Sequence, residues 1–337
     1  MSMTGFDLSF RHLCSPYITF RFEFPTQIRR KIHYGCTCTA IRPTICSTSA
    51  PSTAVSDSNE NHARTSYGRR MMISMITFLL PFHESMQHSS SANANAADDL
   101  LLLQEEIRKV LTKGKAAGVL RLVFHDAGTY ETNENSGGMN GSILYELDRP
   151  ENKGLKKSLK IILEAKKMVE ETQPVSMSVS VSDVIAVAGA EAVSLCGGPK
   201  IPVRLGRLDS MVPDPEGKLP EETLDAFGLK QSFKRKGFST QELVALSGAH
   251  TLGSKGFGNP IIFDNSYYKV LLEKPWLSPG GMTSMVGLPS DRGLIEDDEC
   301  LRWISKYADD QDLFFKDFKN AYIKLVNSGA KWRRPNS

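Results

Sequence analysis

Two short segments of the sequence carry histidines among residues that could do acid–base or metal chemistry. In the first, Arg121, Phe124 and His125 stand at positions i, i+3 and i+4, so on a helix their side chains share one face. A cation beside an imidazole could polarise and deprotonate a small polar substrate. The second segment, Leu246 to Gly253, presents His250, and imidazole is a common metal ligand. Alone, the first segment is more simply interpreted as an amphipathic helix end that holds one hydrogen-bonded histidine. The second histidine favours the chemical interpretation.

The elements that must position these residues are predicted to be helices. Ser239 followed three residues later by Glu242 predicts a capping box, which opens a helix running to His250. The stretch from Ser182 to Leu195 is rich in Ala and Val, so it predicts a central buried helix that ends at Gly197-Gly198-Pro199. The alternating residues Met177 to Val181 are compatible with a strand or with a local insertion. Apolar residues at helical spacing predict further helices over 100–111, 155–169, 267–273, 300–307 and 311–327. The predicted fold class is therefore all-α.

Charge and cysteine are distributed unevenly along the 337 residues. The net charge is +3, but the first 96 residues hold nine of the Lys and Arg and five of the Asp and Glu. The remainder has 32 and 33, a net charge near −1, so we expect no nucleic-acid partner. No apolar run is long enough for a membrane span, so we expect no transmembrane segment in the mature chain. Four of six cysteines lie in the leader, and Cys196 and Cys300 could form one disulfide but no framework.

The two histidine motifs also carry a family resemblance. R-x-x-F-H-D-A-G followed by L-S-G-A-H-T-L-G resembles the haem peroxidases of plants, fungi and bacteria, most closely class I and its ascorbate peroxidase family. Within that family, the chain is similar to the divergent ascorbate-peroxidase-like branch of the thylakoid lumen. The resemblance implies a haem-peroxidase fold over residues 97–337, with two helical lobes and a haem crevice between them. It runs from about Leu100 to Lys331 and includes Gly137-Gly138, Glu146 to Leu155, Gly206-Arg207, Asp214 to Pro220, Phe263-Asp264-Asn265 and Leu288 to Asp291.

The resemblance assigns the distal side of a haem b site. It implies that His125 acts as base and then acid on hydrogen peroxide, and that Arg121 supports the developing charge. Phe124 packs over the haem, where ascorbate peroxidases usually have tryptophan. Asn152 matches the asparagine that binds the other nitrogen of the distal histidine and so fixes its tautomer. Without the motif around it, Asn152 would be read as a loop cap.

The resemblance also assigns the proximal side. His250 would bind the iron, and Asp291 would bind its other nitrogen and raise its basicity. Thr251, Asn259 and Asp264 are candidates for remnants of a proximal cation site, because they offer hard oxygen ligands. Lys113 matches the lysine that contacts ascorbate in the family, although a solvated surface lysine is the simpler interpretation.

The chain departs from the family between His250 and Phe263, which only 12 residues separate. Ser254 to Gly258 stands where the family has a longer loop with a stacking tryptophan, an ascorbate-binding arginine and propionate contacts. We therefore expect an opened proximal wall and an altered or lost ascorbate site. Two functions stay open: an enzyme that reduces hydrogen peroxide with a small reductant in the oxidative-stress response, or a degenerate scaffold with little or no haem that partners a photosynthetic membrane complex.

The leader predicts the compartment. Residues 1–68 are rich in Ser and Thr and have seven Lys or Arg against four Asp or Glu, which is typical of a plastid transit peptide. In residues 69–96, Arg69-Arg70 precedes the apolar stretch Met71 to Leu80 and the small residues Ala92 to Ala96, which indicates a twin-arginine export signal. The alternative is a buried core helix. These segments predict delivery to the thylakoid lumen and a mature chain from about Ala97.

Overall fold

The computed structural model describes residues 97–172, 179–273 and 286–334, all within the unit Arg69–Ser337. The predicted transit peptide over residues 1–68 and the export signal over residues 69–96 lie outside the described residues. Met177 and Ser178 of the alternating segment lie outside them as well.

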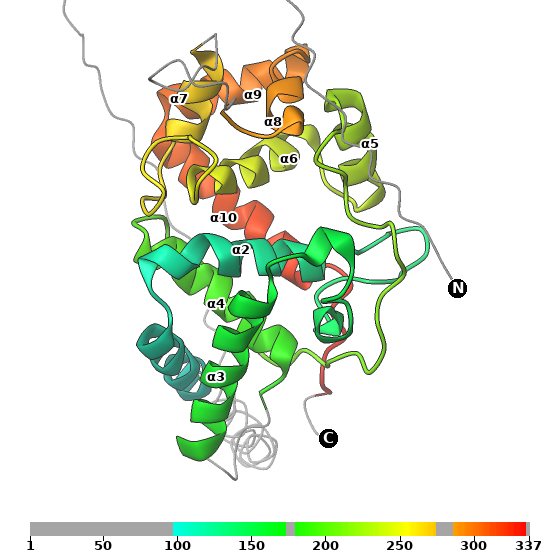
Figure 1. Cartoon of the computed structure of the whole chain (residues 1–337), viewed down its shortest axis with the longest axis vertical. Helices are drawn as coiled ribbons and strands as arrows, with labels where there is room; N and C mark the ends of the chain where they lie inside the picture. The colour runs from blue at the N-terminus through cyan, green and yellow to red at the C-terminus, as the bar shows by residue number, and fades with distance from the viewer. Residues whose placement is uncertain (1–96, 173–178, 274–285, 335–337) are drawn as a thin grey trace, which may run out of the picture. The chain divides into compact units, whose positions relative to one another are not determined.

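One lobe is built around a buried helix. It comprises a helix over residues 97–110, α2 (Lys113–Ala127), α3 (Lys156–Thr172) and α4 (Val181–Leu195), and α2, α3 and α4 pack on one another in the lower half of Figure 1. Every residue of α4 from Val181 to Val193 is buried, so the prediction of a central apolar helix is confirmed. The Ser180 side chain caps α4, and Gly197, at a φ of +96°, lets the chain turn away after its end.

The other lobe carries the second histidine, and α10 joins the two lobes. Five of its helices connect in a row, since α5 contacts both α6 and α8 while α9 contacts both α6 and α7. α10 contacts α2 on one side and α6 and α9 on the other, and it runs between the lobes in Figure 1. The helices are α5 (Ala226–Arg235), α6 (Thr240–Ser247), α7 (Ser266–Leu272), α8 (Pro289–Leu294), α9 (Asp298–Asp309) and α10 (Gln311–Asn327). Three 3₁₀ turns complete the set: η1 (Ser142–Tyr145), η2 (Pro150–Asn152) and η3 (Gly248–Thr251).

The predicted helices are present, with one correction at the site. The capping box of Ser239 and Glu242 opens α6 as expected, but α6 ends at Ser247 and His250 lies on η3. The hydroxyl of Tyr268 explains the early end, because it donates to the carbonyls of Val244 and Ala245 at 2.9 and 3.3 Å. α5 and α8 were not predicted. In the alternating segment, Val179 and Ser180 precede α4 without forming a strand, and the described residues contain isolated bridges only.

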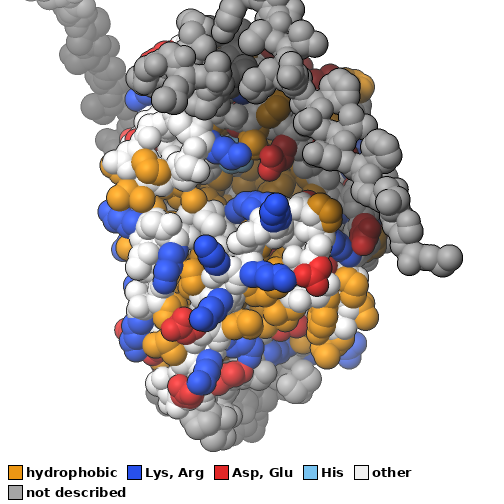
Figure 2. All heavy atoms as spheres, viewed as in Figure 1, with side chains coloured by type: hydrophobic (Ala, Val, Ile, Leu, Met, Phe, Trp, Pro, Cys, Tyr) orange, Lys and Arg blue, Asp and Glu red, His pale blue; other side chains and the backbone are white. Residues whose placement is uncertain are grey.

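The remaining sequence expectations concern cysteine, membranes and surface charge. Cys196 and Cys300 are both buried free thiols, so the disulfide considered from the sequence does not form. No helix in the described ranges combines the length and the apolar character that crossing a membrane requires. On the face shown in Figure 2, Lys and Arg side chains are interspersed with acidic and apolar ones over the lobe that holds α2 and α3. Lys156, Lys157 and Lys160 of α3 point outward, as its amphipathic spacing predicts.

Candidate active site

The distal group forms at the C-terminal end of α2, where the helix meets the loop that contains η2. His125 Nδ1 lies 2.7 Å from Asn152 Oδ1, and Arg121 Nε donates to His125 Nε2 at 3.2 Å. The ring of Phe124 is edge-on to His125, with centroids 6.4 Å apart, and stacks on Phe233 at 6.1 Å. The structure therefore brings together the four distal residues that the sequence singled out.

The orientation of Asn152 determines which nitrogen of His125 carries the proton. Asn152 is buried, and its amide nitrogen donates to the carbonyl of Glu146 at 2.9 Å. Its oxygen must then face the imidazole, so His125 donates from Nδ1 and accepts at Nε2. Arg121 braces the same loop by donating to the carbonyls of Glu151 at 2.6 Å and Lys153 at 3.0 Å.

Electrostatics keep His125 neutral. Burial lowers its pKa to about 4, and the charge of Arg121 acts in the same direction. The hydrogen bond to Asn152 and the carboxylates of Glu151 and Glu222 oppose the shift without cancelling it. At neutral pH the imidazole is therefore a free base, ready to accept a proton at Nε2.

A buried acidic cluster, which sequence reasoning missed, holds the distal loop against α2. Asp126 accepts hydrogen bonds from the backbone of Gly141 at 2.9 Å and Ile143 at 3.1 Å, and burial raises its pKa to about 7. The backbone N–H of Asp214 donates to Glu146 at 2.8 Å. These bonds place the Glu146 carbonyl, and with it Asn152. In the sequence, the signal for this cluster was Asp126, which directly follows His125 in the motif.

The proximal group forms where η3 meets α8. His250 Nδ1 lies 2.7 Å from Asp291 Oδ1, while Asp291 Oδ2 accepts from the backbone of Leu288 at 2.8 Å. Burial alone would lower the pKa of His250, but the charge of Asp291 raises it. Burial would likewise raise the pKa of Asp291, but His250 lowers it. Because Asp291 engages Nδ1, Nε2 is the nitrogen left to bind a metal, and 39% of the His250 side chain is exposed.

The proximal wall that we expected to be open is partly filled, because Phe257 of the shortened loop turns inward. Its side chain is only 2% exposed and meets the ring of Tyr267 edge-on, with centroids 4.7 Å apart. Gly256 and Gly258 have φ values of +92° and +94°, so two flanking glycines allow this tight turn. Tyr267 is fully buried, its ring lies 6.0 Å from that of His250, and its hydroxyl donates to Asp291 Oδ1 at 2.9 Å. Sequence reasoning missed both aromatic residues.

The weaker candidates are only partly assembled. Thr251 donates to Asp264 at 2.9 Å, whereas Asn259 accepts from the backbone of Ile261 in its own loop. In the described part of the chain, no contact joins Asn259 to the other two. Lys113 is exposed at the first turn of α2, about 18 Å along the helix from His125. Its charge acts to lower the pKa of the Cys196 thiol, against the rise that burial causes.

The elements that carry the two histidines, α2 and η3, contact one another. The carboxylate of Glu222 acts in the direction that raises the pKa of both His125 and His250. Its carbonyl accepts from the backbone of Ser290 at 3.1 Å, which anchors it beside Asp291. A histidine with Nε2 free to bind a metal, and a second, neutral histidine on a contacting element, are the groups that a haem site needs. Across the described ranges, no group of three or more His, Cys, Asp and Glu residues offers an alternative protein-only metal site.

Comparisons with known proteins show which family the chain is similar to. A sequence profile described as "Peroxidase" matches residues 103–310. A protein of Arabidopsis thaliana named "Putative L-ascorbate peroxidase 6" is 66% identical over 276 residues, which cover 82% of this chain and 81% of the relative. The chain belongs to the peroxidase family, in its class I ascorbate-peroxidase-like group. The all-α fold of this family is the one predicted from the sequence.

Other relatives of this peroxidase are more distant. "L-ascorbate peroxidase 2, cytosolic" of Arabidopsis thaliana is 38% identical over 63% of this chain and 84% of its own length. A "Putative heme-binding peroxidase" of Cryptococcus neoformans is also 38% identical, over 69% of this chain and 78% of its own length. The first name places that relative in the cytosol, and the second says that the fungal protein binds haem.

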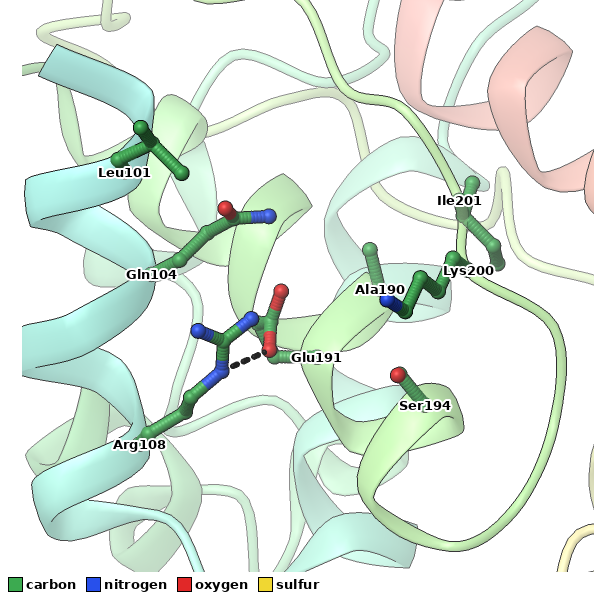
Figure 3. A pocket seen from close by; sticks show the side chains of 8 residues that line it. All are labelled: Leu101, Gln104, Arg108, Ala190, Glu191, Ser194, Lys200 and Ile201. Atoms are coloured by element: carbon green, nitrogen blue, oxygen red, sulfur yellow. Dashed lines mark hydrogen bonds and ion pairs between the residues drawn. The ribbon is translucent and has the colours of Figure 1, made fainter. Parts of the chain in front are cut away.

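The peroxidase has a pocket away from the histidines. A pocket between the helix over residues 97–110 and α4 is crossed by an ion pair in which Arg108 donates to Glu191 at 2.7 Å (Figure 3). Leu101 and Gln104 line it from the first helix, and Lys200 borders it on the far side. Neither His125 nor His250 lines it, so it is separate from the site described above.

Proposed function

We propose that this peroxidase reduces hydrogen peroxide with haem b held by His250. The observation that carries the proposal is that the two histidines are hydrogen-bonded in the same way. Each has Nδ1 engaged by a hydrogen bond of 2.7 Å, and each has Nε2 left for chemistry. A lone structural histidine has no need of such an arrangement, and two on contacting elements suit iron ligation by one and proton transfer by the other.

The chain's own residues then have distinct tasks. Haem, when bound, supplies an iron that takes part in splitting the O–O bond. His125 Nε2 accepts the proton from one peroxide oxygen and delivers it to the other, so that water leaves. Arg121 stabilises the charge that develops on the departing oxygen. In the structure Arg121 donates to His125 Nε2 at 3.2 Å, which is long for a hydrogen bond. Bound peroxide takes the place of this hydrogen bond. Asp291 keeps Nε2 of His250 directed at the iron.

The degenerate alternative, a scaffold that binds a photosynthetic membrane complex, rested on an opened proximal wall and on the loss of the family's donor site. The burial of Phe257 and Tyr267 beside Asp291 weakens the first of these arguments and so supports the enzyme. The reductant is proposed to be a small phenol, or ascorbate bound in a way that differs from the family site. Lys113 is the only part of the family's ascorbate site that the sequence retains, and it lies at the far end of α2 from His125.

We further propose that the protein is delivered to the thylakoid lumen. The support is the order of features along the leader. A segment with more basic than acidic residues comes first, and Arg69-Arg70, an apolar stretch and small residues follow it. Import into isolated chloroplasts tests this location. The double substitution Arg69→Lys and Arg70→Lys should stop the chain in the stroma. If the unsubstituted chain stays unprocessed outside the organelle, the proposal is contradicted.

The first test of the activity is an absorption titration of the chain with ferric haem. A saturable Soret band that His250→Ala weakens is the expected result, followed by a spectral change when hydrogen peroxide is added. His125→Ala should keep the haem and lose the peroxide reaction. A flat titration with well-folded protein would contradict the peroxidase function.

A further inference from the structure

A row of oxidisable rings leads away from the proximal group. The ring centroids of Tyr267 and Tyr268 are 5.0 Å apart, those of Tyr268 and Tyr307 are 5.2 Å apart, and those of Tyr307 and Trp303 are 5.8 Å apart. The three tyrosines are fully buried, whereas Trp303 is partly exposed on α9. α7 and α9 lie side by side at the top of Figure 1, so the row crosses from one helix to the next.

The inner end of the row touches the histidine that we assign to the iron. Tyr267 donates to Asp291 Oδ1, and the same oxygen lies 2.7 Å from His250 Nδ1. Two hydrogen bonds therefore connect the phenol to the imidazole. An electron that leaves Tyr267 has a short route to the group bound at Nε2.

Proton acceptors stand at the positions where oxidation needs them. A tyrosine that loses an electron becomes a strong acid and must pass its proton to a neighbouring base. Tyr267 donates to Asp291, and Tyr307 donates to Asp317 at 2.9 Å, so both phenols have a carboxylate partner. Tyr268 donates to backbone carbonyls, which are poor bases, and it serves as a short bridge between the other two.

Phenylalanine rings also pack on one another in the described residues, and they differ from the row in chemistry. Phe124, Phe233 and Phe238 are in contact on the distal side, and Phe263, Phe314 and Phe318 pack in the core of the second lobe. Phe314 also flanks the row, with its centroid 5.0 Å from that of Tyr268 and 6.0 Å from that of Tyr307. Phenylalanine is too difficult to oxidise to relay an electron. Packing alone would not require that every ring from the proximal ligand to the surface be tyrosine or tryptophan.

We propose that Tyr267, Tyr268, Tyr307 and Trp303 form an electron-transfer path, and that Trp303 is a second oxidation site for anionic one-electron donors. This proposal rests on the peroxidase function. Reduction of one hydrogen peroxide to two waters consumes two electrons from the donors and two protons from solvent. Two donor molecules each give one electron to oxidised Trp303. Tyr267 and Tyr307 each recover a proton from Asp291 and Asp317 as the electron is replaced, and Tyr268 keeps its proton.

The charges around Trp303 select the donor. The ammonium of Lys306 lies 4.4 Å from the centroid of the indole, and Arg302, the preceding residue on α9, is exposed. The Lys306 ammonium at the partly exposed indole, with Arg302 on the same surface helix, attracts a negatively charged reductant and repels a cationic one. Hexacyanoferrate(II) is a suitable probe, because it is an anion that gives up one electron.

The test maps where oxidation arrives in the haem-loaded chain. One equivalent of hydrogen peroxide is added with a nitroso spin trap, and the adducts are located by peptide mass spectrometry. We expect an adduct on Trp303 that Tyr307→Phe abolishes while the Soret spectrum is retained. Tyr322→Phe is the matched control, since Tyr322 is another buried tyrosine and donates to the carbonyl of Ala186 outside the row.

Steady-state oxidation of hexacyanoferrate(II) gives an independent readout. Trp303→Phe should reduce it strongly and Lys306→Gln should raise its KM, whereas Trp332→Phe should not change it. Trp332 is a fair control because its ring also lies against cations, those of Arg204 and Arg207. If peroxide changes the haem spectrum but Trp303 gains no adduct, the path is wrong and the peroxidase function stands. If peroxide causes no spectral change, both proposals fail.

Discussion

At the scale of the residue, His125 is neutral because burial holds its pKa at about 4. The reaction with peroxide needs the unprotonated imidazole, so its rate should be flat near neutrality and fall as pH drops through about 4. Asn152→Asp should move this fall to higher pH, since a carboxylate at Nδ1 raises the pKa of the imidazole. His125→Ala should slow the reaction by about 10²–10⁴-fold. Stopped-flow mixing with hydrogen peroxide measures the rate of each protein as a function of pH. If the fall in rate at low pH occurs at the same pH in Asn152→Asp, the role of His125 is contradicted.

Asp291 is a positioning residue, and its charge can be removed with little change in shape. Asp291→Asn should weaken haem binding by about 10–100-fold, the usual effect of losing a partner behind a metal-binding histidine. Transfer of haem to an excess of an apo-globin gives the affinity. Asp264→Asn is the matched control, because Asp264 accepts a hydrogen bond from Thr251, next to His250, without touching the imidazole. Equal losses in both variants would mean that the effect is structural.

At the scale of the element, the close packing of Gly248 sets the position of η3. A Cβ at this position would overlap the hydroxyl of Tyr268 and the ring of Phe314, both of which are buried. Gly248→Ala should therefore destabilise the fold by about 1–3 kcal/mol and displace His250, which lowers haem affinity. Urea unfolding and haem titration measure the two effects. Gly114→Ala on α2 is the control, since nothing lies within 4 Å of its Cβ, and it should leave both nearly unchanged or raise stability slightly.

The same elements show how far the sequence could predict the structure. The spacing of apolar residues was sufficient for α3 and α4, because each is long and buries a face that its own sequence displays. α8 has six residues, too few to show a period, although Asp225 gave an unused N-cap signal for α5. The contact of Tyr267 with Asp291 and the inward turn of Phe257 depend on packing between segments distant in sequence. No local pattern encodes such contacts, so the proximal wall could not be predicted.

At the scale of the whole molecule, one buried ion pair ties α4 to the end of α10. Arg207 is fully buried, bonds to Asp183 Oδ1 at 2.9 Å, and donates to the carbonyl of Val326 at 2.9 Å and to Asn327 at 3.0 Å. Asp183 also accepts from the backbone of Gly206 at 2.8 Å. Because α10 contacts helices of both lobes, this pair secures the element that joins them.

Asp183→Asn should therefore act on both lobes together. It leaves the Arg207 charge buried without its partner, which costs about 3–5 kcal/mol, whereas removing both charges with Asp183→Leu and Arg207→Met should cost less than the single change. Asp148→Asn is the control, because its pair with Lys156 is exposed and should contribute almost nothing. Urea unfolding followed by far-UV circular dichroism and by tryptophan fluorescence measures the loss. If α10 couples the lobes, both signals move to lower urea by the same amount in Asp183→Asn. A transition that splits, with fluorescence and helix content lost at different urea concentrations, would mean that the lobes hold together without this pair.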